Sequence, residues 1–276
     1  MIRIFFTFLV AHANEVILSS GLGGWNRQQL WNQYTSYKAY SDMGILTGAS
    51  ILAYNLQENG MLGVYPINDT DLTAETYQQY LKTHLGLKAY PCVYCDASLG
   101  NCQNLSARLE NLYLQQEAFL QDSLHRADMY GWDGYSVDFE PDDAVNATKL
   151  MDFLIAWGDL LYQSNRTLQV WIGGDTPYDL DRMFNTTGIV FLTMDTYTDT
   201  YESFLNIATP LQTSINNISN LGFGLLTNYG QKSSQTMTDI EEIVHWSILT
   251  KAGPLSLWAS HIPPLWYKPL RRYVEE

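Results

Sequence analysis

The sequence predicts an α/β protein whose chain closes into a single (β/α)8 TIM barrel. Three observations favour this fold. Short apolar runs alternate with helical stretches, eight such runs occur, and no linker, repeat or low-complexity segment divides the chain. The 276 residues also match the roughly 250 that such a barrel needs. We therefore expect one domain over residues 14–276, with parallel strands joined by crossover helices.

Eight stretches rich in β-branched and aromatic residues are the candidate strands. Strands of a parallel barrel are covered on both faces, so they are expected to be short and almost continuously apolar. In chain order the candidates are Val16 to Ser20, Ser50 to Leu56, Leu87 to Tyr94, Tyr135 to Phe139, Leu168 to Ile172, Ile189 to Met194, Gly222 to Leu226 and Leu255 to Trp258.

Amphipathic helices are expected between these strands. The clearest example has Leu150, Leu154, Trp157 and Leu161 at positions i, i+4, i+7 and i+11, which places all four on one helical face. A second stretch of the same kind contains Leu120, Leu124 and Ala127.

The amino-terminal residues 1–13, "MIRIFFTFLVAHA", have the pattern of a short secretory signal peptide. Arg3 precedes an apolar run that ends in Ala11, His12 and Ala13, a small-x-small sequence typical of signal-peptidase cleavage. The mature chain would then begin near Asn14. The alternative is a buried first strand, because the phenylalanines of this run would also suit a core.

Six Asn-x-Ser/Thr sequons agree with export, since each is an acceptor for N-glycosylation in a secreted protein. Together with the signal they predict a glycoprotein that is secreted or lysosomal. The six asparagines are Asn68, Asn104, Asn146, Asn165, Asn185 and Asn217.

The three cysteines, Cys92, Cys95 and Cys102, lie within eleven residues of one another. Their odd number predicts one local disulfide and one free or intermolecular thiol, without deciding which pair is joined. A zinc site would need a fourth ligand, and the histidines show no paired ligand spacing. We expect no metal and no cofactor.

The formal charge of −14 argues against attraction to nucleic acid or to anionic membranes. After residue 13 no segment stays apolar for the roughly 20 positions of a membrane span. With 46% apolar and 13% aromatic residues the chain can build a large core. We expect a soluble monomer whose partner is neutral or basic.

The segment "GWDGYSVDFEP", residues 131–141, carries the densest set of acids on an apolar strand. Alternate side chains of a strand share a face, so Ser136, Asp138 and Glu140 are expected to point the same way. Glu140 ends the strand, which is where barrel enzymes place catalytic groups, and Asp138 lies one layer deeper. Neighbouring, partly buried carboxylates hinder each other's ionisation, which suits a general acid. The alternative is a structural hydrogen-bond network beside a solvated loop.

The longer segment "LQDSLHRADMYGWDGYSVDFEP" resembles the fourth strand of glycoside hydrolase family 18, the chitinases, chitobiases and short endo-β-N-acetylglucosaminidases. The family pattern D-G-x-D-x-D-x-E is matched by Asp133, Gly134, Asp138 and Glu140, while Ser136 stands where the family usually has Asp or Asn. Weaker similarities to the third, sixth, seventh and eighth strands of the family follow in the right order, in "LKAYPCVYCD", "LTMDTYTD", "GFGLLTNYG" and "PLSLWAS".

The resemblance implies catalysis without an enzyme nucleophile. Glu140 would protonate the glycosidic oxygen, and the 2-acetamido carbonyl of the substrate would attack the anomeric carbon. Asp138 would orient the acetamido N–H, Tyr197 would hydrogen-bond the acetamido oxygen, and Trp258 would form the floor of the −1 subsite. Each aromatic residue could instead have a rim or core role.

Further contacts with substrate are expected from Asp133, Ser136, Asp195 and Tyr229. Ser136 is the departure that matters, because a serine can donate a hydrogen bond to Asp138 but cannot share a proton with it as a carboxylate would. We therefore expect Asp138 to be held differently and the pH optimum to be shifted.

The resemblance also bears on the shape of the cleft. Many chitinases of this family carry an α+β insertion before the eighth strand, and the roughly 28 residues between Leu226 and Leu255 leave no room for one. We expect an open, shallow groove.

Three functions stay open at this point. The first is a hydrolase of β-1,4-linked N-acetylglucosamine, acting on chitin oligomers or on the chitobiose core of N-glycans. The second is a chitinase-like lectin that has lost turnover. The third is a retaining glycosidase that uses Glu140 with a second carboxylate such as Asp195, about 5 Å away.

Overall fold

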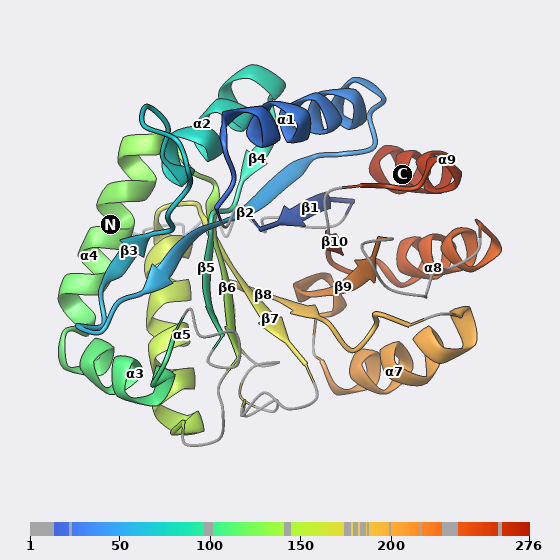
Figure 1. Cartoon of the computed structure of the whole chain (residues 1–276). Coiled ribbons are helices and arrows are strands. Elements are labelled where there is room, and N and C mark those ends of the chain that lie inside the picture. Colours follow the sequence, from blue (N-terminus) through green and yellow to red (C-terminus); the bar gives the residue numbers. More distant parts are fainter. Residues whose placement is uncertain are drawn as a thin grey trace, which may run out of the picture.

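The computed structural model describes residues 14–21, 24–96, 102–140, 145–173, 178, 182, 186, 188–198, 200–215, 217–227, 237–258 and 261–276. Within these ranges, parallel strands close into a ring and helices lie around the outside (Figure 1). The predicted single (β/α)8 barrel is confirmed. No helix of the described ranges is long and apolar enough to cross a membrane. The expected signal peptide, residues 1–13, lies outside them.

The barrel strands are β1 (Val16–Ser20), β2 (Gly48–Leu56), β5 (Cys92–Asp96), β6 (Gly134–Glu140), β7 (Thr167–Ile172), β8 (Ile189–Thr193), β9 (Leu221–Leu226) and β10 (Leu255–Trp258). Two shorter strands, β3 (Leu62–Val64) and β4 (Lys88–Ala89), pair with β2. The helices are α1 (Arg27–Asp42), α2 (Ala74–Leu85), α3 (Leu105–Leu114), α4 (Gln116–Tyr130), α5 (Ala147–Gln163), α7 (Tyr201–Ser214), α8 (Met237–Thr250) and α9 (Tyr267–Glu275), with 3-10 turns at Ile218–Asn220 and Pro264–Trp266.

The ring runs β1-β2-β5-β6-β7-β8-β9-β10 and closes through parallel pairing of β10 with β1. Closure leaves no barrel strand with an unpaired edge. The register on either side of β6 places Ser136 beside Cys92 of β5 and Gln169 of β7, and Asp138 beside Tyr94 of β5. The strand that carries the acids is therefore held by β7 up to Val137 and by β5 from Ser136 to Glu140.

Two details differ from the sequence prediction. The expected strand from Leu87 to Tyr94 is split into β4 and β5, because Pro91 lies between them and has no N–H to donate to the ladder. The antiparallel strand β3 was not predicted, although Asn59 and Gly60 form an Asn-Gly turn of the kind that joins hairpins.

The core has two parts. The larger one lies between the strands and the helices and includes Phe153 and Trp157 of α5 packed against Tyr135 of β6. The smaller part lies inside the barrel, as two clusters. One contains Leu52, Cys92 and Tyr94 with Trp258, and the other contains Trp171, Val190 and Leu192 with Met194 and Tyr197. Aromatic side chains thus line the inside of the barrel.

The strand that carries the acids begins at a close approach between two backbones. A Cβ atom on Gly134 would lie 1.8 Å from the carbonyl oxygen of Thr167 on β7, so only glycine fits there. The residue just before it, Asp133, accepts hydrogen bonds from the backbone N–H of Ala89 and from the ammonium of Lys82. Together these contacts anchor the start of β6.

Candidate functional site

The alternation of β6 separates its side chains into two groups. Tyr135, Val137 and Phe139 point outward into the helical core, where the Tyr135 hydroxyl donates to the carbonyl of Ser123 on α4 at 2.7 Å. Ser136, Asp138 and Glu140 point into the barrel, each one nearer than the last to the carboxyl end of the strand. Ser136 is fully buried, Asp138 is 6% exposed, and Glu140 is partly exposed at the carboxyl end. The predicted common face of the acids is therefore present.

A cavity of about 270 Å³ lies above these side chains, at the carboxyl ends of the strands. This barrel cavity is lined by Tyr94, Asp138, Glu140, Trp171, Met194, Tyr197 and Trp258. Its volume is close to the lower limit for a small-molecule site, so it suits a group of about one sugar ring. Aromatic walls with a few polar groups are the usual composition of such a site.

Tyr197 is positioned beside both acids. A Cβ atom on Gly224 of β9 would lie 2.6 Å from the Tyr197 ring, so the glycine leaves space for that ring inside the barrel. Burial raises the pKa of the Tyr197 phenol well above its usual value, and the negative charges of Asp138 and Glu140 raise it further. The phenol therefore stays protonated at neutral pH and can donate a hydrogen bond into the cavity.

Ser136 lies below Asp138 on the inward face of β6, fully buried and outside the lining of the barrel cavity. Its hydroxyl oxygen accepts a hydrogen bond from the indole N–H of Trp171 at 3.0 Å, which fixes the plane of this wall residue. Cys92, its neighbour on β5, is buried, and burial raises the pKa of the thiol well above its usual value. Asp138 raises that pKa further, while a hydrogen bond with Ser136 lowers it. Cys92 is therefore a neutral thiol and not a nucleophile at neutral pH.

The cysteine prediction is confirmed, with the pairing now assigned. Cys95 and Cys102 form a disulfide that links the end of β5 to the start of α3, and Cys92 is the free thiol. Cys92 and Cys95 lie on opposite faces of β5, because the odd spacing between them turns one into the barrel and the other outward.

Three of the predicted substrate contacts, Asp133, Ser136 and Asp195, are not among the residues that line the barrel cavity. Asp133 lies at the opposite end of β6 from Glu140, ion-paired to Lys82, so a substrate role does not fit its position. Asp195 is exposed and is not one of the seven lining residues, although its neighbours Met194 and Tyr197 are. Tyr229 lies outside the described residues.

Tyr94, Trp171 and Met194 line the cavity and were missed as site residues. Trp171 is next to last in β7, Met194 directly follows β8, and Tyr94 is the middle residue of β5; all three face inward. The sequence signal that could have identified them is an aromatic or long apolar side chain near the carboxyl end of a predicted strand. Among the described residues, no group of three or more His, Cys, Asp or Glu side chains could hold a metal ion.

Comparisons with known proteins give matches at the level of structure. No protein-family model matches the chain, and no curated protein was found that matches it. A chitinase from Chromobacterium violaceum superposes with a TM-score of 0.69 at 13% identity, covering 94% of this chain and 99% of that one. The GH18 chitinase ChiB of Flavobacterium johnsoniae gives 0.68 at 13% identity, covering 96% and 94%.

A third match contains a ligand. It is catalytic domain 2 of the Ostrinia furnacalis Group II chitinase, as a mutant in complex with penta-N-acetylchitooctaose. Its TM-score is 0.68 at 10% identity, covering 95% of this chain and 96% of that one. At these identities the comparisons show a shared fold, the chitinase-like fold of glycoside hydrolase family 18.

The bond between Ser136 and Trp171 generates a stability prediction. Replacing Ser136 with alanine leaves the buried indole N–H of Trp171 without its acceptor, so Ser136→Ala is expected to cost about 1–3 kcal/mol in urea unfolding. In a cycle with Trp171→Phe the two changes should couple by roughly 0.5–3 kcal/mol. Strictly additive effects would contradict the hydrogen bond.

Proposed function

We propose that this chain, which has the chitinase-like fold of glycoside hydrolase family 18, is a glycosidase acting on β-1,4-linked N-acetylglucosamine. One observation carries the proposal: Asp138, Glu140 and Tyr197 converge on a single ring-sized cavity at the carboxyl end of a closed barrel. The aromatic walls, Trp171 and Trp258, suit the apolar face of a pyranose ring. The similarity to chitinases, including one described with a chitooligosaccharide, supports this substrate class.

The proposed reaction starts from the heights of the two acids in the cavity. Glu140, at the mouth, donates its proton to the glycosidic oxygen of the bond that breaks. The carbonyl oxygen of the substrate's own acetamido group bonds to the anomeric carbon on the opposite face and displaces the leaving sugar. An oxazolinium ion forms, and Glu140 is left as a carboxylate.

The deeper groups hold the acetamido group in place for this attack. Asp138 accepts a hydrogen bond from the acetamido N–H, and its negative charge offsets the positive charge of the oxazolinium. The protonated phenol of Tyr197 donates to the acetamido oxygen. Water then gives a proton to Glu140 and attacks the anomeric carbon, and the bond between that carbon and the acetamido oxygen breaks. This step restores the acid and the acetamido group and retains the β configuration.

A two-carboxylate scheme is less well supported by the geometry. In the described part of the chain, the carboxylates lining the barrel cavity are Asp138 and Glu140, both on β6. A separate nucleophile would have to approach from another strand, and Asp195, the rival in the sequence, is exposed. Participation of the substrate removes the need for that second enzyme group.

We further propose that the protein is exported as a monomeric glycoprotein, to the cell exterior or to lysosomes. Five of the six sequon asparagines fall in the described ranges, and all five are exposed: Asn68, Asn104, Asn146, Asn165 and Asn217. In Asn146, which caps α5, the side-chain oxygen accepts from the backbone of Lys149, so its amide nitrogen stays available for a glycan.

The catalytic assignment predicts that Glu140→Gln lowers kcat/KM on a fluorogenic chitobioside by about 10²- to 10⁴-fold, because the amide cannot donate the proton. Asp195→Asn is the matched control and should stay within about twofold of wild type. Unchanged hydrolysis by Glu140→Gln would overturn the assignment. Oligosaccharide binding without turnover between about pH 4 and pH 8 would instead indicate a lectin.

Export predicts glycan on the protein made in a eukaryotic cell. Treatment with a peptide:N-glycosidase should increase its electrophoretic mobility, and replacing each exposed asparagine with glutamine should remove one step of that shift. The same chain made in bacteria is the control. An unshifted band from the eukaryotic secretory pathway would refute the glycoprotein proposal.

A further inference from the structure

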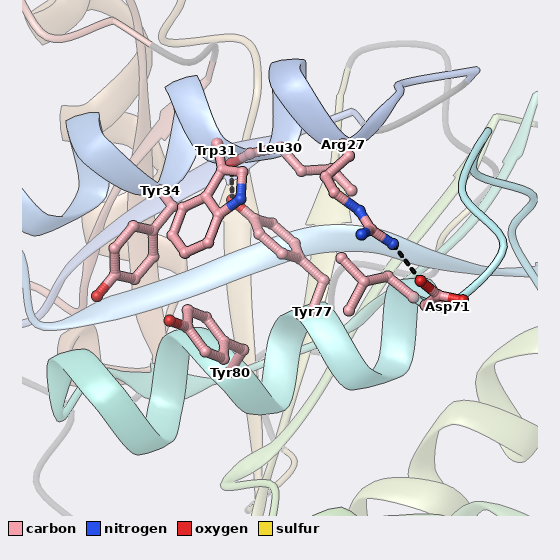
Figure 2. Close-up of a pocket in the computed structure, with 8 residues that line it drawn as sticks. Arg27, Leu30, Trp31, Tyr34, Asp71, Tyr77 and Tyr80 are labelled. Atoms are coloured by element: carbon pink, nitrogen blue, oxygen red, sulfur yellow. Dashed lines mark hydrogen bonds and ion pairs between the residues drawn. The ribbon is translucent and has the colours of Figure 1, made fainter.

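We propose that a second pocket, on the outer surface between α1 and α2, binds neutral chains of β-1,4-linked N-acetylglucosamine. This aromatic surface pocket has a volume of about 280 Å³ and is lined chiefly by Arg27, Trp31, Tyr34, Asp71, Tyr77 and Tyr80. Figure 2 shows Trp31 and Tyr34 extending from α1 toward α2, while Tyr77 and Tyr80 extend from α2 toward α1. The inference rests on the proposed function for its choice of saccharide.

The rings form a packed platform with one widely exposed member. Trp31 is 49% exposed, an unusual position for a tryptophan unless its surface is used. Its ring meets Tyr34 at 5.3 Å and Tyr80 at 6.1 Å, both nearly perpendicular. Tyr77 lies buried behind them, and its hydroxyl donates to the carbonyl of Leu30 at 3.0 Å. The platform is therefore held in place before any ligand binds.

The opposite end of the pocket is polar and rigid. Arg27 donates through Nε and Nη2 to both carboxylate oxygens of Asp69, and through Nη2 to Asp71 at 2.6 Å. Asp69 also accepts hydrogen bonds from the backbone N–H groups of Asp71 and Leu72, and these bonds fix the position of the carboxylate that holds the Arg27 guanidinium. Within the described ranges, no hydrogen bond uses Nη1 of Arg27. A sugar hydroxyl or acetamido carbonyl can accept from Nη1, and a hydroxyl can donate to Asp71.

The charges at this end favour a neutral ligand. Arg27 lowers the pKa of both Asp69 and Asp71 below the usual value through direct hydrogen bonds, so one cation faces two carboxylates at neutral pH. An anionic saccharide or phosphate would meet a net negative charge in a protein of charge −14.

Two other kinds of ligand fit the geometry less well. A quaternary ammonium needs open space between rings, whereas the Tyr34 and Tyr80 centroids are 5.2 Å apart and in direct contact. A partner helix would need several anchors along a long groove, and about 280 Å³ holds one ring-sized group. A pyranose ring, apolar on its face and polar at its edge, matches both parts of the pocket.

The polar end of the pocket lies toward the catalytic end of the barrel. Helices of this fold begin where the preceding strand ends, and Arg27 is the first residue of α1 after β1. Asp71 lies just before α2, which follows the β2–β3 hairpin. The barrel cavity holds about one ring, so a polymer extends beyond it. A second saccharide-binding site near the same end can hold the protein at the surface of an insoluble polymer, where many chains are exposed.

The test compares Trp31→Ala with wild type on colloidal chitin and on the soluble fluorogenic chitobioside. We expect roughly tenfold weaker binding to chitin, and slower release of sugar from it, with unchanged hydrolysis of the soluble substrate. Trp31→Phe should restore most of the binding because it keeps a ring. Leu114→Ala is the matched control, since Leu114 is 85% exposed on α3 and outside the pocket.

Several results would overturn the surface site: chitin binding unchanged in Trp31→Ala, an equal loss in Leu114→Ala, or an equal loss of activity on the soluble substrate. Asn68 forms a bridge with Asn26, the residue before Arg27, so a glycan on Asn68 would lie near the pocket. Binding that appears only in Asn68→Gln would also overturn the surface site, because the chain's own glycan would then cover the pocket. Repeating the binding series in the Glu140→Gln background separates the two proposals. Failure of catalysis leaves Trp31-dependent binding in place, whereas failure of the surface site leaves hydrolysis of the chitobioside in place.

Discussion

The two-residue period of β6 inside a closed barrel is the constraint on which the rest of this structure depends. Because the barrel has an inside and an outside, each step along the strand assigns a side chain either to the cavity or to the helical core. Tyr135, Val137 and Phe139 fill the core, and this burial fixes the register that points Ser136, Asp138 and Glu140 inward. A slip of one residue would bury the acids under the helices and expose the aromatic rings to the cavity. The close contact at Gly134 and the pairing with β5 and β7 prevent that slip.

The electrostatics of the barrel interior follow from the same arrangement. Beside the two carboxylates of the cavity, burial and the charge of Asp138 raise the pKa of both Tyr197 and Cys92, and Glu140 raises the pKa of Tyr197 further. A neutral phenol and a neutral thiol add no further negative charge. Ser136 contributes to the same balance, because this chain has a hydroxyl that orients Trp171 at the position where the family pattern usually has Asp or Asn. The charge of the site is therefore concentrated on Asp138 and Glu140, the groups that the proposed reaction uses.

Features of the fold that local periodicity encodes could be predicted from the sequence. Features that depend on contacts between distant segments could not. The alternation of β6 could be predicted because it is a pattern within a short stretch. The single barrel could be predicted because such short apolar patterns recur eight times along the chain. Pro91 split a predicted strand, and the β3 hairpin was overlooked despite its Asn-Gly turn. Asp133 was expected to contact substrate, yet it lies at the other end of the strand, beside Lys82. The aromatic surface pocket joins residues such as Arg27 and Asp71, 44 positions apart, so no local pattern could predict it.

The substrate's own acetamido group is the nucleophile of the proposed reaction, with Asp138 and Tyr197 to hold it and Glu140 to protonate the leaving oxygen. The most direct test compares kcat/KM for two chromogenic chitobiosides that differ only at the sugar next to the bond that breaks. One carries an N-acetyl group there and the other an N-trifluoroacetyl group, whose carbonyl is a much weaker nucleophile. We expect kcat/KM to fall by orders of magnitude for the trifluoroacetyl substrate. Equal rates for the two would show that the carbonyl does not attack, and would contradict the proposed mechanism.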